Sequence, residues 1–213
     1  MTLNPLALPS IHIGTSMGSV SDGLRRITVR ISNHTQSHRP AHSHGSGVTW
    51  RSDGLIVTNA HVATGKSLIV QFQDGRHAMS QLIARDPSID LAALAVNLRD
   101  LPAVIPPRPQ PDNRATTSRD TRDLRVGELV LAVGNPFDGE GAVSTGILHR
   151  SPGNGPCIFA DIRLAPGNSG GPLADAYGNV IGVNCATIGG LGCAIKTETV
   201  QAFLREAGML EAA

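Results

Sequence analysis

The sequence predicts an all-β fold built from many short antiparallel strands. Its 213 residues include 24 glycines and 14 prolines but only 3% aromatic residues, a composition typical of chains with many turns. Short apolar or alternating segments recur between the turns, and Asp53-Gly54 and Asp74-Gly75 are dipeptides favoured in two-residue hairpin loops. A chain of this length is long enough to bury a sizeable core.

The expected elements fall into two groups separated by a proline-rich stretch. Strands of the first group are expected at 26–31, 47–51, 55–58, 67–73, 76–85 and 91–96. Strands of the second group are expected at 128–133, 142–149, 157–162 and 180–184. A helix is expected over 196–207, because apolar residues share one face there, with Thr197 as its N-cap and Gly208 as its stop.

Ser169 is the candidate nucleophile. It stands in the string A-P-G-N-S-G-G-P-L (165–173), the tightest glycine setting of the chain. A serine hydroxyl attacks a carbonyl only with a base to take its proton and with backbone N–H donors for the oxyanion. Gly167, Gly170 and Gly171 allow the sharp turn that would bring the amides of Gly167 and Ser169 together. A glycine-rich hairpin with an incidental serine would look similar, so the partners decide.

Two upstream residues complete a candidate triad. His61 follows an apolar strand in V-T-N-A-H-V (57–62), and Asp90 opens an apolar run in S-I-D-L-A-A-L-A-V (88–96). The order His61, Asp90, Ser169 is that of chymotrypsin-type triads. Asp86 is a nearby competitor for the aspartate role, although its neighbour Pro87 favours a turn or capping role.

These segments resemble the HtrA/Deg branch of trypsin-like serine proteases. The resemblance also includes G-S-G-V (45–48), R-V-G-E-L-V-L-A-V-G-N-P-F (125–137) and G-N-V-I-G-V-N (178–184), and it runs from about residue 27 to 204. It implies two six-stranded antiparallel β-barrels with the active site between them. It also implies a protease domain only, because the chain ends at Ala213 and leaves no room for a PDZ domain.

The resemblance assigns further site residues. The oxyanion hole is expected at Gly167, Asn168 and Ser169. The uncharged Asn168, where trypsins carry an aspartate, makes activation by propeptide cleavage unexpected. Residues expected to line the specificity pocket are Leu164, Cys185, Ala186, Thr187 and Cys193. These small or apolar residues favour cleavage after Val, Ala or Leu, whereas Arg163 in the pocket would favour Glu or Asp.

The predicted domain organisation has four parts. Residues 1–23 form an N-terminal arm, and 24–103 form the first barrel with His61 and Asp90. Residues 104–123 form a Pro/Arg-rich linker, and 124–213 form the second barrel with Ser169 and the C-terminal helix. Apolar residues in the arm favour a homo-oligomer, although residues 1–48 lack the aromatic residues that trimers of the resembled family use.

Composition restricts the partners and the compartment. A formal net charge of +1 gives no reason to expect nucleic acid or an acidic membrane surface as partner. The four histidines within 34–44 are expected to be a solvated loop rather than a metal site, and no cofactor is expected. Three cysteines favour a reducing compartment, although a Cys185–Cys193 pair stays open. With a poor signal peptide, the expected location is cytoplasmic, or periplasmic or extracellular if an upstream segment is missing.

The leading functional hypothesis is a serine endopeptidase that acts on unfolded or misfolded polypeptides through a Ser-His-Asp triad. The alternative is a peptide-binding or chaperone module on the same fold, holding extended peptides by strand addition with weak or absent catalysis.

Overall fold

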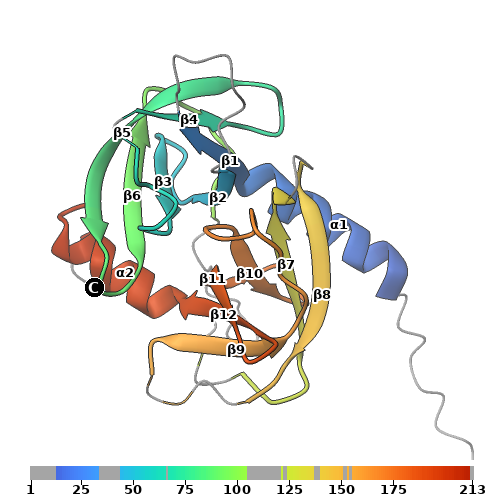
Figure 1. The fold of residues 1–213 in the computed structure, drawn as a ribbon. Helices are drawn as coiled ribbons and strands as arrows, with labels where there is room; N and C mark the ends of the chain where they lie inside the picture. The colour runs from blue at the N-terminus through green and yellow to red at the C-terminus, as the bar shows by residue number, and fades with distance from the viewer. Residues whose placement is uncertain are drawn as a thin grey trace, which may run out of the picture.

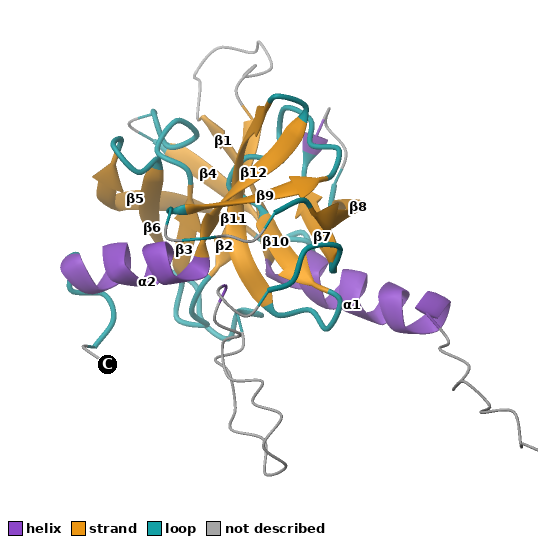
Figure 2. Cartoon of the chain, turned by 90° about the horizontal axis from the view of Figure 1, so that it is seen from below, coloured by secondary structure: helices purple, strands orange, loops and turns teal. Residues whose placement is uncertain are grey.

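The computed structural model describes residues 13–33, 44–65, 67–104, 121, 124–136, 140–150, 153 and 155–211. Two closed six-stranded barrels lie side by side, and the two helices flank them at opposite ends of the molecule (Figures 1 and 2). The expected all-β double barrel with a C-terminal helix is confirmed. The predicted linker at 104–123 and the arm up to residue 12 lie largely outside the described residues.

The first barrel has the strand order β1-β2-β3-β6-β5-β4 and closes by antiparallel pairing of β1 with β4. Its strands are β1 (Thr28–Asn33), β2 (His44–Thr49), β3 (Leu55–Thr58), β4 (Leu68–Gln71), β5 (His77–Asp86) and β6 (Leu91–Val96). Val29, Ile56, Val70 and Leu94 point into its interior and are fully buried. The alternation in β1 and β4 therefore reflects one face toward this core and one face toward solvent.

The second barrel has the order β10-β11-β12-β9-β8-β7 and closes by pairing of β10 with β7. Its strands are β7 (Leu129–Gly134), β8 (Ala142–Leu148), β9 (Cys157–Asp161), β10 (Pro172–Asp175), β11 (Val180–Ile188) and β12 (Leu191–Lys196). β10 and β12 were not predicted, because each is short and is entered from glycine-containing turns that hide its pattern. β10 begins at Pro172, three residues after Ser169, and β12 pairs with β11.

The helix α1 (Ile13–Ile27) is a difference from the prediction, which starts a strand at Arg26. Met17, Val20, Leu24 and Ile27 follow the spacing of one helical face and pack on the hydrophobic core shared by the two barrels. Figure 1 shows α1 beside β7 and β8 of the second barrel. The first strand accordingly begins at Thr28, whose hydroxyl donates to the carbonyl of Leu24 at 2.8 Å.

The helix α2 (Thr197–Glu206) carries the chain from the second barrel back toward β6 of the first, as Figure 1 shows. Val200, Phe203 and Leu204 bury their side chains in the core shared by the barrels. Thr197 is not the N-cap: Lys196 occupies that position, and the Thr197 hydroxyl donates to the carbonyl of Val180 at 2.9 Å. Gly208, at φ +71°, follows the helix end, consistent with its predicted role as a stop.

Candidate active site

His61 and Asp90 form a hydrogen-bonded pair at one end of the first barrel. The Nδ1 atom of His61 lies 2.8 Å from Oδ2 and 3.0 Å from Oδ1 of Asp90, and the backbone N–H of His61 donates to Oδ1 at 3.0 Å. This contact favours the tautomer with the proton on Nδ1, which leaves Nε2 as a proton acceptor. The His61 side chain is 50% exposed, so a reacting group can approach it from solvent.

The backbone fixes the position of Asp90. This residue has φ +55°, in the left-handed region that aspartate tolerates better than most residues. The side-chain amide of Asn59 donates to the Asp90 carbonyl at 3.0 Å and so fastens this turn to the end of β3. The carboxylate therefore reaches His61 from a constrained turn just before β6.

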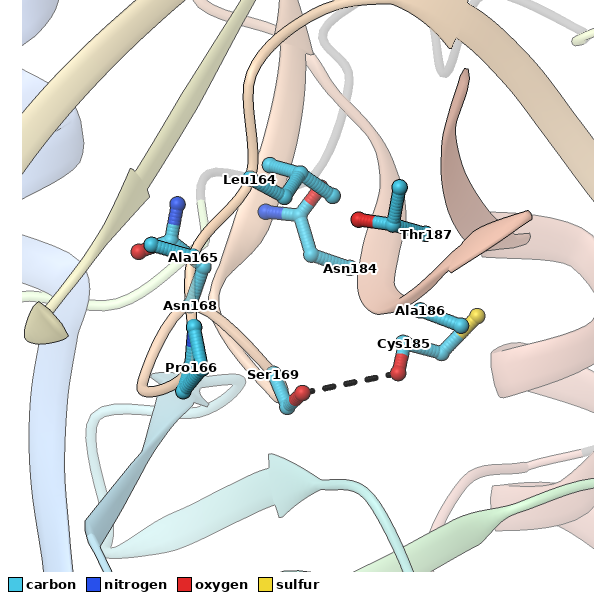
Figure 3. A pocket seen from close by; sticks show the side chains of 9 residues that line it. All are labelled: Leu164, Ala165, Pro166, Asn168, Ser169, Asn184, Cys185, Ala186 and Thr187. Carbon is cyan, nitrogen blue, oxygen red and sulfur yellow. Dashed lines mark hydrogen bonds between the residues drawn. The ribbon is translucent and has the colours of Figure 1, made fainter. Parts of the chain in front are cut away.

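Ser169 lies in a tight loop between β9 and β10. Gly167 has φ +104° and Gly170 has φ +86°. A Cβ at Gly170 would overlap the carbonyl of Ser46, so the close approach of the two barrels requires glycine here. The side chain of Ser169 is partly exposed beside the pocket shown in Figure 3.

Along the Ser169 loop, backbone N–H groups that donate a hydrogen bond alternate with N–H groups that donate none to the described residues. The N–H of Asn168 donates to the Ala165 carbonyl at 3.0 Å, and the N–H of Gly170 donates to the Asn184 carbonyl at 2.8 Å. No group in the described part of the chain accepts a hydrogen bond from the N–H of Gly167 or Ser169. Among the described residues, the N–H groups of Gly167 and Ser169 are therefore available to an oxyanion, whereas the N–H of Asn168 between them is already bonded.

Ser46, on β2, links the first barrel to the nucleophile loop. Its buried hydroxyl donates to the Gly167 carbonyl at 2.7 Å and accepts from the backbone N–H of Asn135 at 2.9 Å and from its side-chain amide at 3.0 Å. Its own N–H donates to the Ser169 carbonyl at 2.8 Å. Ser46 therefore holds the carbonyl of Gly167 with its hydroxyl and the carbonyl of Ser169 with its backbone N–H.

We expect Ser46→Ala to destabilise the fold by about 1–3 kcal/mol, because it removes three buried hydrogen bonds to groups of Asn135 and Gly167. Any hydrolytic activity should fall as well, since the Gly167 peptide loses its anchor. Urea denaturation and steady-state kinetics measure the two effects. Ser80→Ala is the matched control. The Ser80 hydroxyl lies on β5 of the first barrel, far in sequence from the Ser169 loop, and donates to the Leu68 carbonyl. Equal losses in both variants would contradict the assignment.

A pocket of about 420 Å³ opens beside Ser169 (Figure 3). Four of the five residues expected in the specificity pocket line it, namely Leu164, Cys185, Ala186 and Thr187. Cys193 does not line it and is buried with 2% of its surface exposed. Arg163 is exposed and also does not line the pocket, whereas Leu164 packs on the second-barrel core. The pocket wall thus consists of small or apolar residues together with four polar ones, Asn168, Ser169, Asn184 and Thr187.

The hydroxyl of Ser169 donates to the backbone carbonyl of Cys185 at 3.4 Å (Figure 3). Among the described residues this carbonyl, and not the ring of His61, is its hydrogen-bond acceptor. The structure brings His61 and Asp90 together and places Ser169 in the wall of the pocket. Asp86 is not part of this site, because its carboxylate accepts from the N–H and hydroxyl of Ser88.

Sequence reasoning missed Ser46, Asn59 and Asn135, which hold the site together. The motif G-S-G-V contained Ser46, but nothing local to it indicates a partner in the other barrel. The described residues hold no group of three or more His, Cys, Asp or Glu side chains suited to a metal ion, and His34, His38 and His42 lie outside them. No described helix has the length and apolar character needed to cross a bilayer.

Known proteins are similar to this chain in sequence and in fold. A family model described as trypsin-like peptidase domain matches residues 45–183. A probable periplasmic serine endoprotease DegP-like of Halomonas elongata is 37% identical over 158 residues, which is 71% of this chain and 30% of that protein. Its counterpart in Hahella chejuensis is 40% identical over 151 residues, 68% of this chain and 30% of that protein. The chain therefore spans about a third of the length of these curated relatives.

Solved structures agree with this result. The crystal structure of the serine endoprotease from Yersinia pestis has a TM-score of 0.76 at 28% identity, covering 90% of this chain and 66% of that one. The HtrA-type protease AlgW with tripeptide has a TM-score of 0.75 at 29% identity, covering 91% and 63%.

The chain belongs to the trypsin-like peptidase family and, within it, to the HtrA/Deg type. Its fold and its family are those of a serine-type endopeptidase. The cytoplasmic location expected from the sequence is wrong, because the relatives are named periplasmic endoproteases. The physical reason for the error is that a poor N-terminal signal and an odd cysteine count are weak indicators of compartment.

Proposed function

We propose that this chain hydrolyses peptide bonds with Ser169 as nucleophile, His61 as general base and then acid, and Asp90 as the residue that orients the histidine. The contact that carries the proposal is the 2.8 Å approach of His61 Nδ1 to Asp90, since it creates a base whose other nitrogen is free to accept a proton.

The reaction then follows from the groups around Ser169. His61 Nε2 takes the hydroxyl proton as the serine oxygen attacks the substrate carbonyl, and the amides of Gly167 and Ser169 stabilise the oxyanion. Collapse releases the amine, which receives the proton from His61, and leaves an acyl-enzyme. A water molecule activated by the same histidine hydrolyses it. The N–H of Asn168, which is already bonded to Ala165, takes no part.

The Ser169 hydroxyl must leave the Cys185 carbonyl before it can react. That carbonyl lies in β11 beside the pocket, where an extended substrate can pair with the strand and supply N–H donors. We infer that substrate binding competes for this carbonyl and releases the hydroxyl toward His61. The proposed substrates are unfolded or misfolded polypeptides, and the proposed location, by relationship to the periplasmic endoproteases, is the periplasm.

A fluorophosphonate probe tests the proposal, because it forms a covalent bond only with an activated serine. We expect labelling of the wild type and none of Ser169→Ala. The alternative function is a peptide-binding module, favoured by the bond of the Ser169 hydroxyl to Cys185 rather than to His61. Absence of labelling in the wild type, with an unfolded polypeptide still bound, would establish that alternative.

The pocket predicts cleavage after Val, Ala or Leu. Leu164→Ala should enlarge the pocket and shift the preference toward Phe or Met, by about 10-fold or more in relative kcat/KM, since one or more methylene groups change the fit. Arg163→Ala is the control and should leave the profile unchanged, because its side chain is exposed outside the pocket. A peptide library measures both. A strong acidic preference that disappears in Arg163→Ala would overturn this assignment.

A further inference from the structure

The peptide unit between Ala60 and His61 is held on both of its sides. Its N–H, which belongs to His61, donates to Oδ1 of Asp90 at 3.0 Å. Its carbonyl, which belongs to Ala60, accepts a hydrogen bond from Nε of Arg85 at 3.0 Å. The N–H and C=O groups of a planar trans peptide point in opposite directions. Two side chains on opposite sides therefore fix the plane of the peptide that leads into the candidate base.

Arg85 supplies a hydrogen bond that the backbone does not replace. Ala60 is buried, with 1% of its surface exposed, and no backbone N–H in the described part of the chain donates to its carbonyl. In the same turn, by contrast, the Asn59 carbonyl accepts from the N–H groups of Val62 and Ala63 at 3.1 Å each. A buried carbonyl without a partner is unfavourable. The Ala60 carbonyl thus depends on a side chain from another strand.

A bulge in β5 turns the Arg85 side chain toward this turn. The register of β5 against β6 shifts by one residue between Leu82 and Ala84. Such a shift exchanges the faces to which the later side chains point. After it, Arg85 pairs with Ala92, and Ala92 pairs with Thr58. These three residues form one row across β5, β6 and β3, in which Ala92 contributes only a methyl group, so a long side chain from β5 can reach the turn that follows β3.

Arg85 and Asp90 lie on either side of one hairpin turn. Asp86 ends β5 and pairs with Leu91, which begins β6, so residues 87–90 form the turn between the strands. Oδ1 of Asp90 accepts from the His61 N–H and also lies 3.0 Å from Nδ1 of the His61 ring. Because one oxygen serves both groups, a rotation of the peptide also disturbs the contact with the ring. The orientation of His61 therefore depends on both side chains of this hairpin.

We propose that Arg85 is a positioning residue for the reaction, which orients His61 through the carbonyl of Ala60. The inference deepens the proposed function and rests on it, because it assigns a support to the proposed base. Arg85 makes and breaks no bond of the substrate in this role. Without its hydrogen bond, the Ala60–His61 peptide turns about the line joining its Cα atoms, and Nδ1 of His61 moves out of line with the Asp90 carboxylate.

Arg85→Met tests the proposal, because methionine keeps an unbranched apolar side chain but donates no hydrogen bond. We expect kcat for peptide hydrolysis to fall about 10- to 100-fold, since a displacement of about 1 Å can cost a catalytic group this much. KM should stay within about twofold of the wild type, because Arg85 does not line the pocket. Arg85→Lys should recover kcat to within about fivefold of the wild type, since its ammonium group can donate to the same carbonyl.

Arg76→Met is the matched control. The Nε atom of Arg76 also donates to a single oxygen, Oδ2 of Asp74 at 2.8 Å, but in the turn between β4 and β5. This variant should keep the kcat of the wild type. Thermal melts should show that Arg85→Met and Arg76→Met each lower Tm by about 4 °C or less, the effect of losing one hydrogen bond in a chain of this size. Equal losses of kcat in the two variants would mean that Arg85 has no special role.

Proton NMR gives a readout that needs no substrate. The Nδ1 proton of His61, which faces Asp90, is assigned by the loss of its signal in His61→Ala. This signal should shift or disappear in Arg85→Met and should return in Arg85→Lys. An unchanged signal in Arg85→Met, a wild-type kcat in that variant, or no recovery of kcat in Arg85→Lys would overturn the proposal. If the wild type hydrolyses no peptide and takes up no fluorophosphonate, the proposed function fails, whereas a signal that changes in Arg85→Met and returns in Arg85→Lys would still establish that Arg85 orients His61.

Discussion

Ser169→Ala and His61→Ala are each expected to lower kcat for peptide hydrolysis about 10⁶-fold, because the members of a triad act as a unit. Without the hydroxyl no acyl-enzyme forms. Without the imidazole, no base of comparable strength lies beside Ser169 among the described residues, since the other polar side chains of the pocket are the neutral amides of Asn168 and Asn184 and the hydroxyl of Thr187. Steady-state hydrolysis of a casein-like protein and of an aliphatic peptide substrate measures the loss. Both variants should retain the fold, since neither side chain is fully buried.

Exposed residues of the same types serve as controls. Ser88 and His77 lie outside the site. Ser88→Ala and His77→Ala should therefore keep wild-type turnover. A His61→Ala variant with near-normal turnover would refute the assignment of the base, even if Ser169→Ala were inactive.

The strands were predictable where the run of apolar residues in the sequence matches the residues that the barrel buries. β3 and β6 were predicted at their observed bounds because each is a short apolar run beside a turn. The Asp74-Gly75 turn stands in the predicted place, but its loop has three residues, 73–75, and not two, because the N–H of Phe72 donates to the Arg76 carbonyl at 2.8 Å. Gly75, at φ +85°, is the left-handed residue of this loop.

The helix α1 was missed although its signal is present. Met17, Val20, Leu24 and Ile27 recur at intervals of three and four, which predicts one apolar helical face. Pro5 and Pro9 interrupt the segment before it, and the alternation over 26–31 predicted an earlier strand. Packing against both barrels overrode the weak local propensity.

The triad candidates could be read from local motifs, but their supports could not. Ser46 lies 121 residues from Gly167 and 89 residues from Asn135 in sequence, and only barrel closure and docking bring them together. The sequence also left open a Cys185–Cys193 pair, and the structure shows both cysteines free.

The sequence also offered two aspartates for one role, and the pair of substitutions Asp90→Asn and Asp86→Asn separates them. Asp90→Asn is expected to lower kcat about 10⁴-fold, because an amide NH₂ group facing Nδ1 stabilises the wrong tautomer of His61. The fold should be retained, since asparagine tolerates the left-handed backbone at this position.

Asp86→Asn is the matched control, and its carboxylate bonds only locally. The hydroxyl and N–H of Ser88 donate to it and hold the pKa of Asp86 below its usual value. Its loss should therefore leave kcat within about twofold of the wild type, as surface substitutions usually do. Kinetics and thermal melts of the two variants provide the measurement. Equal losses of activity at matched stability would mean that the contact between Asp90 and His61 is structural, and that the histidine is oriented by another group.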